Sequence, residues 1–468
     1  MKRILILSRG NVGTYMSSPG IRAYYMAQVL AKALPDAQIT LGIPNRKHVP
    51  EEIPNVRVVS CGMVSSYGLV GESDIVISSG FAPQFAFQFP NTVFVADLFS
   101  QYFMEWMEVT KGQAKGVRRV FWMNQNLAYL RMQLAFADFI LCANERQRDT
   151  YVGMLSSMGL ISPSKYDSDD SLRRLIDVAP HGVRPDDLLH ERRVMKGVIP
   201  GIRETDTVVL WNSGTVHWYD PEPLLRALHI LSQERNDIKA LFLGASYPGI
   251  AGIGKGARFQ SALELSKELG LYERSVFFEF GWVPFEDVKN YLLESDLSVC
   301  TYFETLETRY SYRTRFMDVF WAELPLICTR GDVLASMVEE RGLGIVVPAS
   351  DTDAVLAALR RMVDDREFYQ QCKDNLANIK PELTWERALE PLVRFCREGG
   401  SSAMPRQERL GQVLSRTAEY LRGWLIREMQ GITSFDDDGL FPSASLRVKG
   451  IADFISKRLD PESPGGYE

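Results

Sequence analysis

Short apolar segments alternate along the chain with longer segments in which apolar residues recur every three or four positions. The segment 21–34, IRAYYMAQVLAKAL, and the segment 117–137 have the helical pattern, and each predicts an amphipathic helix. Short apolar runs predict buried strands. The strands predicted before residue 150 are 4–8, 38–43, 56–60, 74–79, 92–98 and 138–144. Strands that alternate with helices in this way predict a parallel sheet covered by helices.

A second series of the same kind begins at residue 207 with TVVLWNSG. Its predicted strands are 207–214, 239–245, 275–283, 297–302, 324–329 and 342–350, and its predicted helices are 221–234, 259–270, 285–296 and 354–365. The polar segment from Pro163 to about Thr205, which contains APHGV, is predicted to connect the two series. Two such open sheets would leave a cleft between the carboxyl ends of their strands, where α/β proteins bind ligands.

The sequence therefore predicts an α/β fold with two Rossmann-like domains that face each other across a cleft. Their expected limits are 1–185 and 186–398, and residues 399–468 are expected to form a helical extension with a disordered end. A chain of 468 residues also exceeds one typical hydrophobic core. In the extension, 404–430 predicts a helix that contains Trp424 and several arginines, a candidate for a peripheral membrane or subunit contact.

Composition excludes several classes of protein. The formal net charge of −6 argues against a general nucleic-acid binder, because such proteins need a basic surface. The six cysteines are widely spaced and form no CxxC pair, so neither a zinc site nor a disulfide framework is predicted. The opening MKRILILSRG is typical of a first strand rather than a signal peptide, and we expect a cytoplasmic protein. No segment approaches the ~20 apolar residues of a membrane span, so membrane contact would be peripheral to the inner face.

The segment 304–331 contains the most informative chemistry. Glu304 and Glu307 come first, the arginines Arg313 and Arg315 follow, and a helix is predicted to begin near Tyr312. Carboxylates accept hydrogen bonds from sugar hydroxyls, while guanidinium groups bind phosphate oxygens, and a helix N-terminus favours the same phosphates. The segment therefore indicates a nucleotide-sugar site. Simple ion pairing remains an alternative, with the two glutamates bound to Arg309 or Arg313 on the surface, and Arg315 bound to Asp318.

Three other places supply candidate residues. Gly20 and Arg22 lie in and after a long strand-to-helix loop, where we favour contact with the ligand over a plain connection. Asp97 ends the apolar strand VFVAD, where it would bind a sugar hydroxyl or, equally, cap the next helix.

The loop 212–221 contains Gly214, His217 and Trp218. Backbone amides after Gly214 would hold a phosphate, and Trp218 would stack on a ring. His217 would bind a phosphate or complete a turn. Trp282, in FGWVP, is expected in the core rather than in a base-binding pocket.

Taken in order, these segments resemble the glycosyltransferases of GT-B architecture, close to retaining family 4, the bacterial group 1 enzymes. The resemblance covers roughly residues 1–395. It is carried by 17–34, by APHGV, and by the segments 208–228, 240–245, 276–299 and 311–332, the last of which reads SYRTRFMDVFWAELPLICTRGD.

The resemblance implies transfer of a sugar from a nucleotide diphosphate donor to a hydroxyl acceptor, with retention, in glycan or polysaccharide biosynthesis. The acceptor would be a glycan, a lipid-linked molecule or a small molecule. Neither a cofactor nor an obligate metal is expected.

The chain departs from the family pattern at three points. A histidine often follows the fourth strand of the first domain, but here the region reads VFVADLFSQYF, with Asp97 as the only ionisable candidate at its start. Asp318 stands where the second of two family glutamates is expected, and the position of the first is Tyr310, so Glu304 or Glu307 would serve through a longer loop. The basic residues that usually open the second domain are absent from 211–221, so Arg313 and Arg315 would neutralise the diphosphate. The prediction assigns Asp97, Glu304 and Glu307 to catalysis, and Gly20, Arg22, Gly214, His217, Trp218, Arg313, Arg315 and Asp318 to donor binding.

Two alternatives remain, the first because of these departures and the second because epimerases can use a related two-domain architecture. The first is a non-catalytic protein that keeps the fold and binds sugar nucleotides or acts as a scaffold. The second is a sugar-nucleotide epimerase, which would need general acid and base residues around the sugar. A nicotinamide oxidoreductase is disfavoured because the glycines lack the GxGxxG spacing.

Overall fold

The computed structural model describes residues 2–50, 52–62, 65–80, 85, 88–111, 116–213, 216–244 and 257–399. Two predictions lie outside these residues. One is the extension from residue 400 onward, with its helix over 404–430, and the other is the phosphate-binding role of Gly214.

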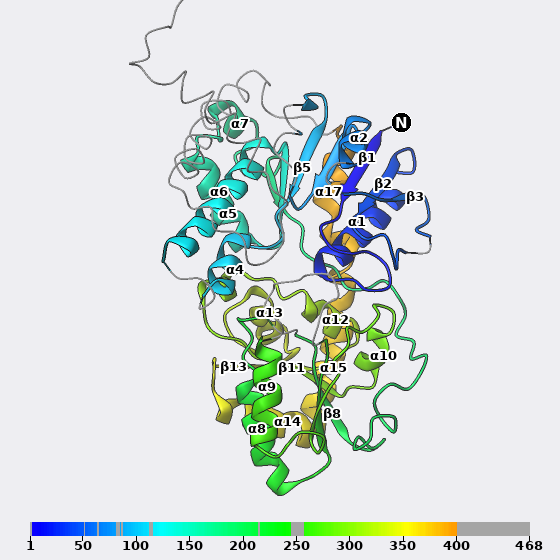
Figure 1. The fold of residues 1–468 in the computed structure, drawn as a ribbon, viewed down its shortest axis with the longest axis vertical. Helices are drawn as coiled ribbons and strands as arrows, with labels where there is room; N and C mark the ends of the chain where they lie inside the picture. Colours follow the sequence, from blue (N-terminus) through cyan, green and yellow to red (C-terminus); the bar gives the residue numbers. More distant parts are fainter. Residues whose placement is uncertain are drawn as a thin grey trace, which may run out of the picture. The chain divides into compact units, whose positions relative to one another are not determined.

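The first domain is built on a seven-stranded sheet in the order β3-β2-β1-β4-β5-β6-β7, and all its strand pairs are parallel (Figure 1). Its strands are β1 (Arg3–Leu7), β2 (Gln38–Ile43), β3 (Val56–Ser60), β4 (Ile75–Ser78), β5 (Val93–Asp97), β6 (Phe139–Cys142) and β7 (Ile176–Val178). The buried strands β1, β4 and β6 are apolar on both faces, as expected of a parallel sheet that is covered by helices on both sides.

The helices between these strands are α1 (Ser18–Ala33), α2 (Ser66–Gly71), α4 (Tyr102–Val109), α5 (Gly116–Phe136), α6 (Glu145–Ser157) and α7 (Pro163–Ser168). Helix α1 begins with a proline in its first turn, where the missing N–H has no intrahelical partner to lose. It buries Tyr25, Met26 and Leu30 against the sheet. This burial fixes the strand-to-helix loop that precedes α1 at the carboxyl edge of β1.

The second domain contains a six-stranded parallel sheet in the order β10-β9-β8-β11-β12-β13. Its strands are β8 (Thr207–Trp211), β9 (Ile238–Phe242), β10 (Val276–Phe278), β11 (Leu297–Cys300), β12 (Leu326–Thr329) and β13 (Gly344–Val347). Its helices are α8 (Glu222–Glu234), α9 (Ala257–Glu268), α10 (Val288–Leu293), α11 (Leu306–Tyr310), α12 (Arg315–Trp321), α13 (Val333–Arg341), α14 (Thr352–Asp364) and α15 (Arg366–Ile379). The two parallel sheets confirm the predicted fold class.

The last described helices, α16 (Trp385–Ala388) and α17 (Glu390–Arg397), return to the first domain. Trp385 stacks on Tyr25 with 5.1 Å between ring centroids, and Phe395 stacks on Phe139 at 4.5 Å. These side chains belong to the same buried cluster as β1 and α1. The segment was expected in the second domain because it follows that domain in sequence, but its apolar face completes the first core.

Two local predictions need correction. The polar segment from Pro163 to Thr205 is more than a connection, because it contains α7 and the short strand β7, whose Ile176 is fully buried beside β6. The helix expected from Tyr312 begins at Arg315, and α11 precedes it.

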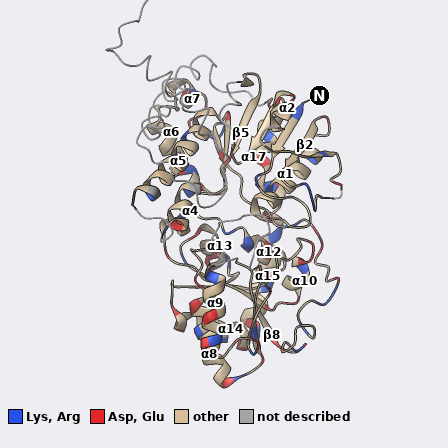
Figure 2. Cartoon of the chain, in the orientation of Figure 1, with Lys and Arg blue, Asp and Glu red and all other residues tan. Residues whose placement is uncertain are grey.

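Acidic and basic side chains are mixed over the helices of the second domain (Figure 2). Ion pairs Arg235–Asp364 and Arg360–Glu234 join α8 to α14, for example, at 2.8 and 2.5 Å. Among the described helices, none has the length and apolar character needed to cross a membrane.

Candidate functional site

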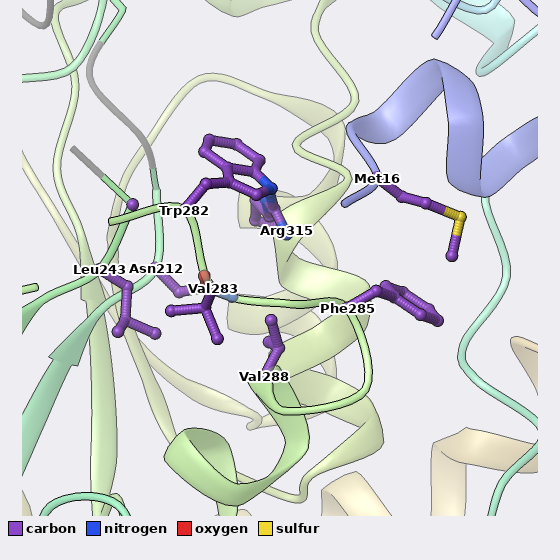
Figure 3. A pocket seen from close by; sticks show the side chains of 9 residues that line it. Met16, Asn212, Leu243, Trp282, Val283, Phe285, Val288 and Arg315 are labelled. Carbon is purple, nitrogen blue, oxygen red and sulfur yellow. The ribbon is translucent and has the colours of Figure 1, made fainter. Parts of the chain in front are cut away.

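A pocket of about 430 Å³, including space open to solvent, lies at the carboxyl edge of the second sheet (Figure 3). It is lined by Met16, Asn212, Leu243, Gly244, Trp282, Val283, Phe285, Val288 and Arg315. We call it the edge pocket. Its mixture of an aromatic ring, apolar side chains and few polar groups is typical of small-molecule sites.

Part of the lining of the edge pocket comes from the segments that follow three adjacent strands, β8, β9 and β10. Asn212 follows β8, Leu243 follows β9, and Trp282 comes from the segment after β10. Met16 belongs to the loop between β1 and α1, so the first domain closes one side. The backbone N–H of Phe285 donates to the carbonyl of Thr14 at 2.8 Å and holds this loop against the second domain. The pocket therefore lies where a parallel α/β sheet is expected to bind ligands.

Arg315 is the cation of the edge pocket. Its guanidinium lies over the ring of Trp282, 5.6 Å from the centroid, and the two side chains are seen together in Figure 3. Its Nη1 donates to Oδ2 of Asp318 at 3.2 Å, so the predicted pairing of these two residues is confirmed. The Arg315 side chain is still 24% exposed. Asn212 makes a long contact of 3.5 Å with the same Asp318 oxygen.

A second pocket of about 340 Å³, also including open space, shares Arg315 with the first. We call it the crossing pocket, because both domains line it. Helices α1 and α16, which pack in the first domain, and the chain that follows β7 line one part of this pocket. The start of α12, in the second domain, lines the other part. The lining residues are Ser18, Ile21, Tyr25, His181, Gly182, Arg184, Thr314, Arg315, Met317, Asp318 and Trp385. Arg315 thus lines both pockets, and its partner Asp318 lines the crossing pocket.

Arg313 lies in a very different environment from Arg315. Its Nη1 and Nη2 donate to the two carboxylate oxygens of Glu307 at 3.0 and 2.8 Å. Arg313 is only 4% exposed and Glu307 only 2%. The pairing considered for Glu307 is therefore confirmed, but the pair is buried and not on the surface. Direct contact between Arg313 and a diphosphate stays a prediction, and this burial speaks against it.

The surroundings keep the Arg313 guanidinium charged. Its carbon lies 4.8 Å from the ring centroid of Tyr302, and its Nε is 3.7 Å from Oδ2 of Asp332. Burial alone would lower the pKa of Arg313, but the carboxylates of Glu307 and Asp332 raise it above its ordinary value. Burial raises the pKa of the Asp332 carboxyl. Buried charge clusters of this kind fix the conformation of the segments that carry them.

Arg22 and Asp97 form a second buried pair, in the first domain. The guanidinium makes three contacts of 2.7 to 3.0 Å with the carboxylate, and its Nη1 donates to the carbonyl of Pro180 at 3.0 Å. Arg22 is 1% exposed. Asp97 does not cap the next helix, because α4 begins five residues later with Gln101 at its N-cap. The pair joins α1, β5 and the chain that leaves β7, and the predicted sugar contacts of its members stay predictions.

The remaining predicted residues are not gathered at one place. Gly20 is required by close packing, since a Cβ there would lie 2.0 Å from the carbonyl oxygen of Asn11. Glu304 is exposed after β11. Trp218 is partly buried, 5.9 Å from the Arg313 guanidinium. Burial and Arg258 lower the pKa of His217, which favours its neutral form. Their predicted roles in donor binding stay predictions.

The sequence did not place two residues at the edge pocket. Trp282 lines this pocket, although it was expected in the core, and Asn212 lines it and contacts Asp318. Glu105, on α4, lines neither pocket, but its carboxyl is partly buried and is influenced electrostatically by Glu307 of the second domain. The repeated aromatic residues around Trp282, SVFFEFGWV, were the available signal, but such a run fits a buried strand equally well.

Glu105 is expected to make stability depend on pH. Burial and then the Glu307 carboxylate raise its pKa to about 7, so the folded protein keeps this proton well above the ~4.3 of an exposed glutamate. Between these values the folded state binds more protons than the unfolded state, and stability falls as pH rises. Glu105→Gln removes the ionisation, so its melting temperature should exceed that of the wild type at pH 8 and differ little near pH 5.

Thermal unfolding at both pH values checks this prediction. Glu108→Gln, one turn away on the same helix, controls for the loss of a helix carboxylate. A Glu105→Gln effect of equal size at pH 5 and pH 8 would contradict the assigned titration.

No group of three or more His, Cys, Asp or Glu side chains gathers in a metal-binding arrangement in the described part of the chain. The acids near the two pockets are instead paired with arginines, as Asp318 is with Arg315. That the protein needs no metal remains a prediction.

Comparison with known proteins finds one family model that matches part of the chain and several solved structures of similar fold. Residues 198–378 match the family described as Glycosyl transferases group 1. No curated protein sequence gave a significant match. The structure is similar to sucrose-phosphate synthase from Thermosynechococcus elongatus, with 15% identity, a TM-score of 0.53, and coverage of 85% of this chain and 99% of that chain.

Two further solved structures are similar over the same extent. One is the Anabaena protein HepE in complex with UDP-glucose, with 13% identity, a TM-score of 0.58, and coverage of 85% of this chain and 100% of that chain. The other is a glycosyltransferase from Rickettsia africae, with 14% identity, a TM-score of 0.58, and coverage of 86% and 99%. At these identities the similarity establishes the fold, which these proteins share with both domains of this chain.

Proposed function

We propose that this chain, whose residues 198–378 match the model of the group 1 glycosyl transferases and whose two domains have the GT-B fold, transfers a sugar from a nucleoside diphosphate to a hydroxyl acceptor. The observation that carries the proposal is the edge pocket, in which Trp282 and Arg315 meet at the carboxyl ends of the second sheet, with Asp318 bound to Arg315 beside the pocket. These side chains offer one partner for each part of a nucleoside diphosphate sugar.

The donor is assigned to the edge pocket by chemical complementarity. The indole of Trp282 provides a flat apolar surface on which a base can stack. Arg315 provides a partly exposed guanidinium that binds phosphate oxygens through two N–H groups. Asp318 accepts hydrogen bonds from hydroxyl groups of the ribose or the sugar. Arg315 already contacts both of the other residues, so a single ligand can reach all three.

In this proposal Arg315 stabilises the leaving group. When the bond between the sugar and the diphosphate breaks, negative charge grows on the phosphate oxygens, and a fixed cation nearby lowers the energy of that state. The two pockets exclude part of the surrounding water, which would otherwise hydrolyse the donor. The buried pairs Glu307–Arg313 and Arg22–Asp97 then position the loops of each domain, while the exposed Glu304 remains available to contact the sugar.

Retention of configuration follows from the resemblance to family 4 and forms part of the proposal. The acceptor oxygen would attack from the side on which the diphosphate departs, and its proton would pass to a departing phosphate oxygen. Asp97 and Glu307, the buried carboxylates, are each held by a guanidinium, which disfavours either as a covalent nucleophile.

The acceptor is assigned to the crossing pocket, which shares Arg315 with the edge pocket and is also lined by Asp318. Its lining combines aromatic rings, such as Tyr25 and Trp385, with hydroxyl and carboxylate groups, which suits a glycan, a lipid-linked sugar or a small hydroxylated molecule. Glycan or polysaccharide biosynthesis is the corresponding pathway class.

A panel of nucleoside diphosphate sugars tests the proposal. The wild-type protein should release one nucleoside diphosphate when donor and acceptor are both present, and NMR of the product should show the anomeric configuration of the donor. Trp282→Ala should raise the donor KM about 5- to 150-fold, because base stacking on an aromatic ring contributes roughly 1–3 kcal/mol.

The control is Phe280→Ala, which removes an aromatic ring two residues away in the same segment. Phe280 is 50% exposed and does not line the edge pocket. Equal kinetic effects of the two substitutions would contradict the base assignment. Tight binding of a nucleotide sugar without any transfer or hydrolysis would favour the non-catalytic alternative.

A further inference from the structure

The start of α6, in the first domain, carries polar side chains that bind backbone carbonyls of the second domain. The amide Nδ2 of Asn144 donates to the carbonyl of Tyr310 at 3.1 Å, and Nε2 of Gln147 donates to the same oxygen at 2.9 Å. Between them, Nη1 of Arg146 donates to the carbonyls of Arg309 at 3.0 Å and Gly331 at 2.8 Å. We call Asn144, Arg146 and Gln147 the α6 clamp.

The two amides of the α6 clamp are held rigidly within their own domain. Asn144 caps α6 by accepting the backbone N–H of Gln147 at 2.9 Å. The Gln147 amide oxygen accepts the N–H of Ala143 at 2.8 Å, while its Nε2 also donates to the carbonyl of Phe99 at 3.3 Å. Gln147 is only 1% exposed. These bonds within the first domain fix the direction of the amide N–H groups of Asn144 and Gln147 that donate to the carbonyl of Tyr310.

Two of the three carbonyls that the clamp binds lie at the end of a helix, where no backbone N–H of the same helix can donate to them. Arg309 and Tyr310 end the five-residue helix α11, and the last carbonyls of a helix have no intrahelical donor. Gly331 follows β12 and adopts a positive φ of 123°, next to the buried Asp332. The clamp therefore supplies hydrogen bonds that α11 cannot supply itself.

The position of these carbonyls in the chain gives the clamp its significance. Residues 311–314 join Tyr310 directly to Arg315, the cation that faces both pockets. Gly331 lies in the loop after β12 and precedes Asp332. The Asp332 carboxylate is 3.7 Å from Nε of Arg313, in the segment between α11 and α12. The first domain thus holds both chain segments that flank the Arg313 cluster and lead to Arg315.

We infer that Asn144, Arg146 and Gln147 are positioning residues for the transfer reaction: through the carbonyls of residues 309, 310 and 331 they hold the segment that carries Arg315. The donor-binding cation of the second domain reaches its working position only when the first domain supports it. The inference rests on the proposed function for its link to the reaction. The hydrogen bonds and the order of the segment can be measured without any substrate.

Arg146 offers the sharpest test, because it is partly exposed and its loss leaves carbonyls that water can reach. The test variant is Arg146→Met, which keeps much of the apolar stem but removes the donors. Arg148→Met is a matched control on the same helix, since Arg148 donates to the carbonyls of Ile176 and Ser171 within the first domain. Arg146→Lys keeps a cationic donor and should restore part of the function.

Hydrogen–deuterium exchange of the substrate-free protein gives the first readout. In Arg146→Met, amides of residues 306–318 should exchange at least about threefold faster than in the wild type, whereas Arg148→Met should leave them unchanged. Thermal unfolding shows whether each variant is folded. Unchanged exchange in Arg146→Met, or equal acceleration in both variants, overturns the inference.

Steady-state kinetics gives the second readout. We expect about a tenfold loss of kcat in Arg146→Met, a smaller change in the donor KM, partial recovery in Arg146→Lys and wild-type kinetics in Arg148→Met. Equal kinetics in Arg146→Met and the wild type overturns the inference. If the wild type transfers no sugar from any donor, the proposed function fails, while exchange in 306–318 still decides whether the clamp positions this segment.

Discussion

Arg315→Ala is expected to lower kcat/KM for the donor by about 100- to 1000-fold, the loss seen when one preorganised group that stabilises developing negative charge is removed. Arg315 is the only residue that lines both pockets in the described part of the chain. Its guanidinium is partly exposed and close to Trp282 and Asp318, so a bound diphosphate can replace solvent around it without breaking the core. Steady-state kinetics with saturating acceptor, together with calorimetric titration of the nucleoside diphosphate, measures the effect.

The size of the effect should depend on geometry as well as charge. Arg315→Lys keeps the charge but loses the fork of N–H groups, so it should recover only part of the activity. Arg309→Ala is a suitable control, because this exposed arginine lies six residues earlier and lines neither pocket. A loss in Arg309→Ala as large as that in Arg315→Ala would show that general surface charge, rather than the position of Arg315, determines activity.

Arg313→Met is expected to lower the free energy of unfolding by about 3–5 kcal/mol, a large share of the roughly 5–15 kcal/mol that stabilises a typical protein. The substitution removes the cation from between Glu307 and Asp332, and both carboxylates are buried. An unpaired buried charge is costly because it has lost its hydration without gaining a partner. Urea-induced unfolding, followed by tryptophan fluorescence, measures the loss.

A double variant separates lost pairing from lost packing. Arg313→Met combined with Glu307→Leu replaces the closest ion pair with apolar side chains, and such replacements of buried pairs are often neutral. We therefore expect the double variant to be more stable than Arg313→Met alone. A double variant that is less stable than the single one would contradict the view that the unpaired Glu307 carboxylate causes the loss.

The different environments of Arg313 and Arg315 explain why the sequence alone does not tell which of two neighbouring arginines can bind a phosphate. Arg313 and Arg315 are two positions apart in a polar segment, and either could bind a phosphate by its chemistry. The structure buries Arg313 against Glu307 and leaves Arg315 at the junction of two pockets. Which side chain points inward depends on where α12 begins, and the start at Arg315 differs by three residues from the predicted start at Tyr312.

Other elements were predictable because their patterns are local. Apolar runs such as 4–8 and 38–43 correspond to β1 and β2, and the alternation of strands and helices correctly gave two parallel sheets. Strand β7 was missed because it has only three residues within a polar segment, and its burial depends on pairing with β6. The placement of Trp385 and Phe395 on the first core could not be predicted either, since an apolar helix face does not reveal its partner.

The candidate site was predictable in its residue types but not in its contacts. The region 304–331 is rich in acids and arginines, and the pairing of Arg315 with Asp318 follows from their spacing on a helix. Arg22 and Asp97 bind each other although they are 75 positions apart in the sequence. The aromatic ring that lines the edge pocket belongs to Trp282, which follows a different strand from Arg315. Contacts over such distances depend on the tertiary fold, which local patterns do not specify.

A crystal structure with the nucleoside diphosphate of the preferred donor tests the central claim most directly. The account predicts a base against the ring of Trp282, phosphate oxygens within about 3 Å of the Arg315 guanidinium, and hydroxyl groups at Asp318. Density for the nucleotide outside the edge pocket, or a bound diphosphate without contact to Arg315, would contradict the account.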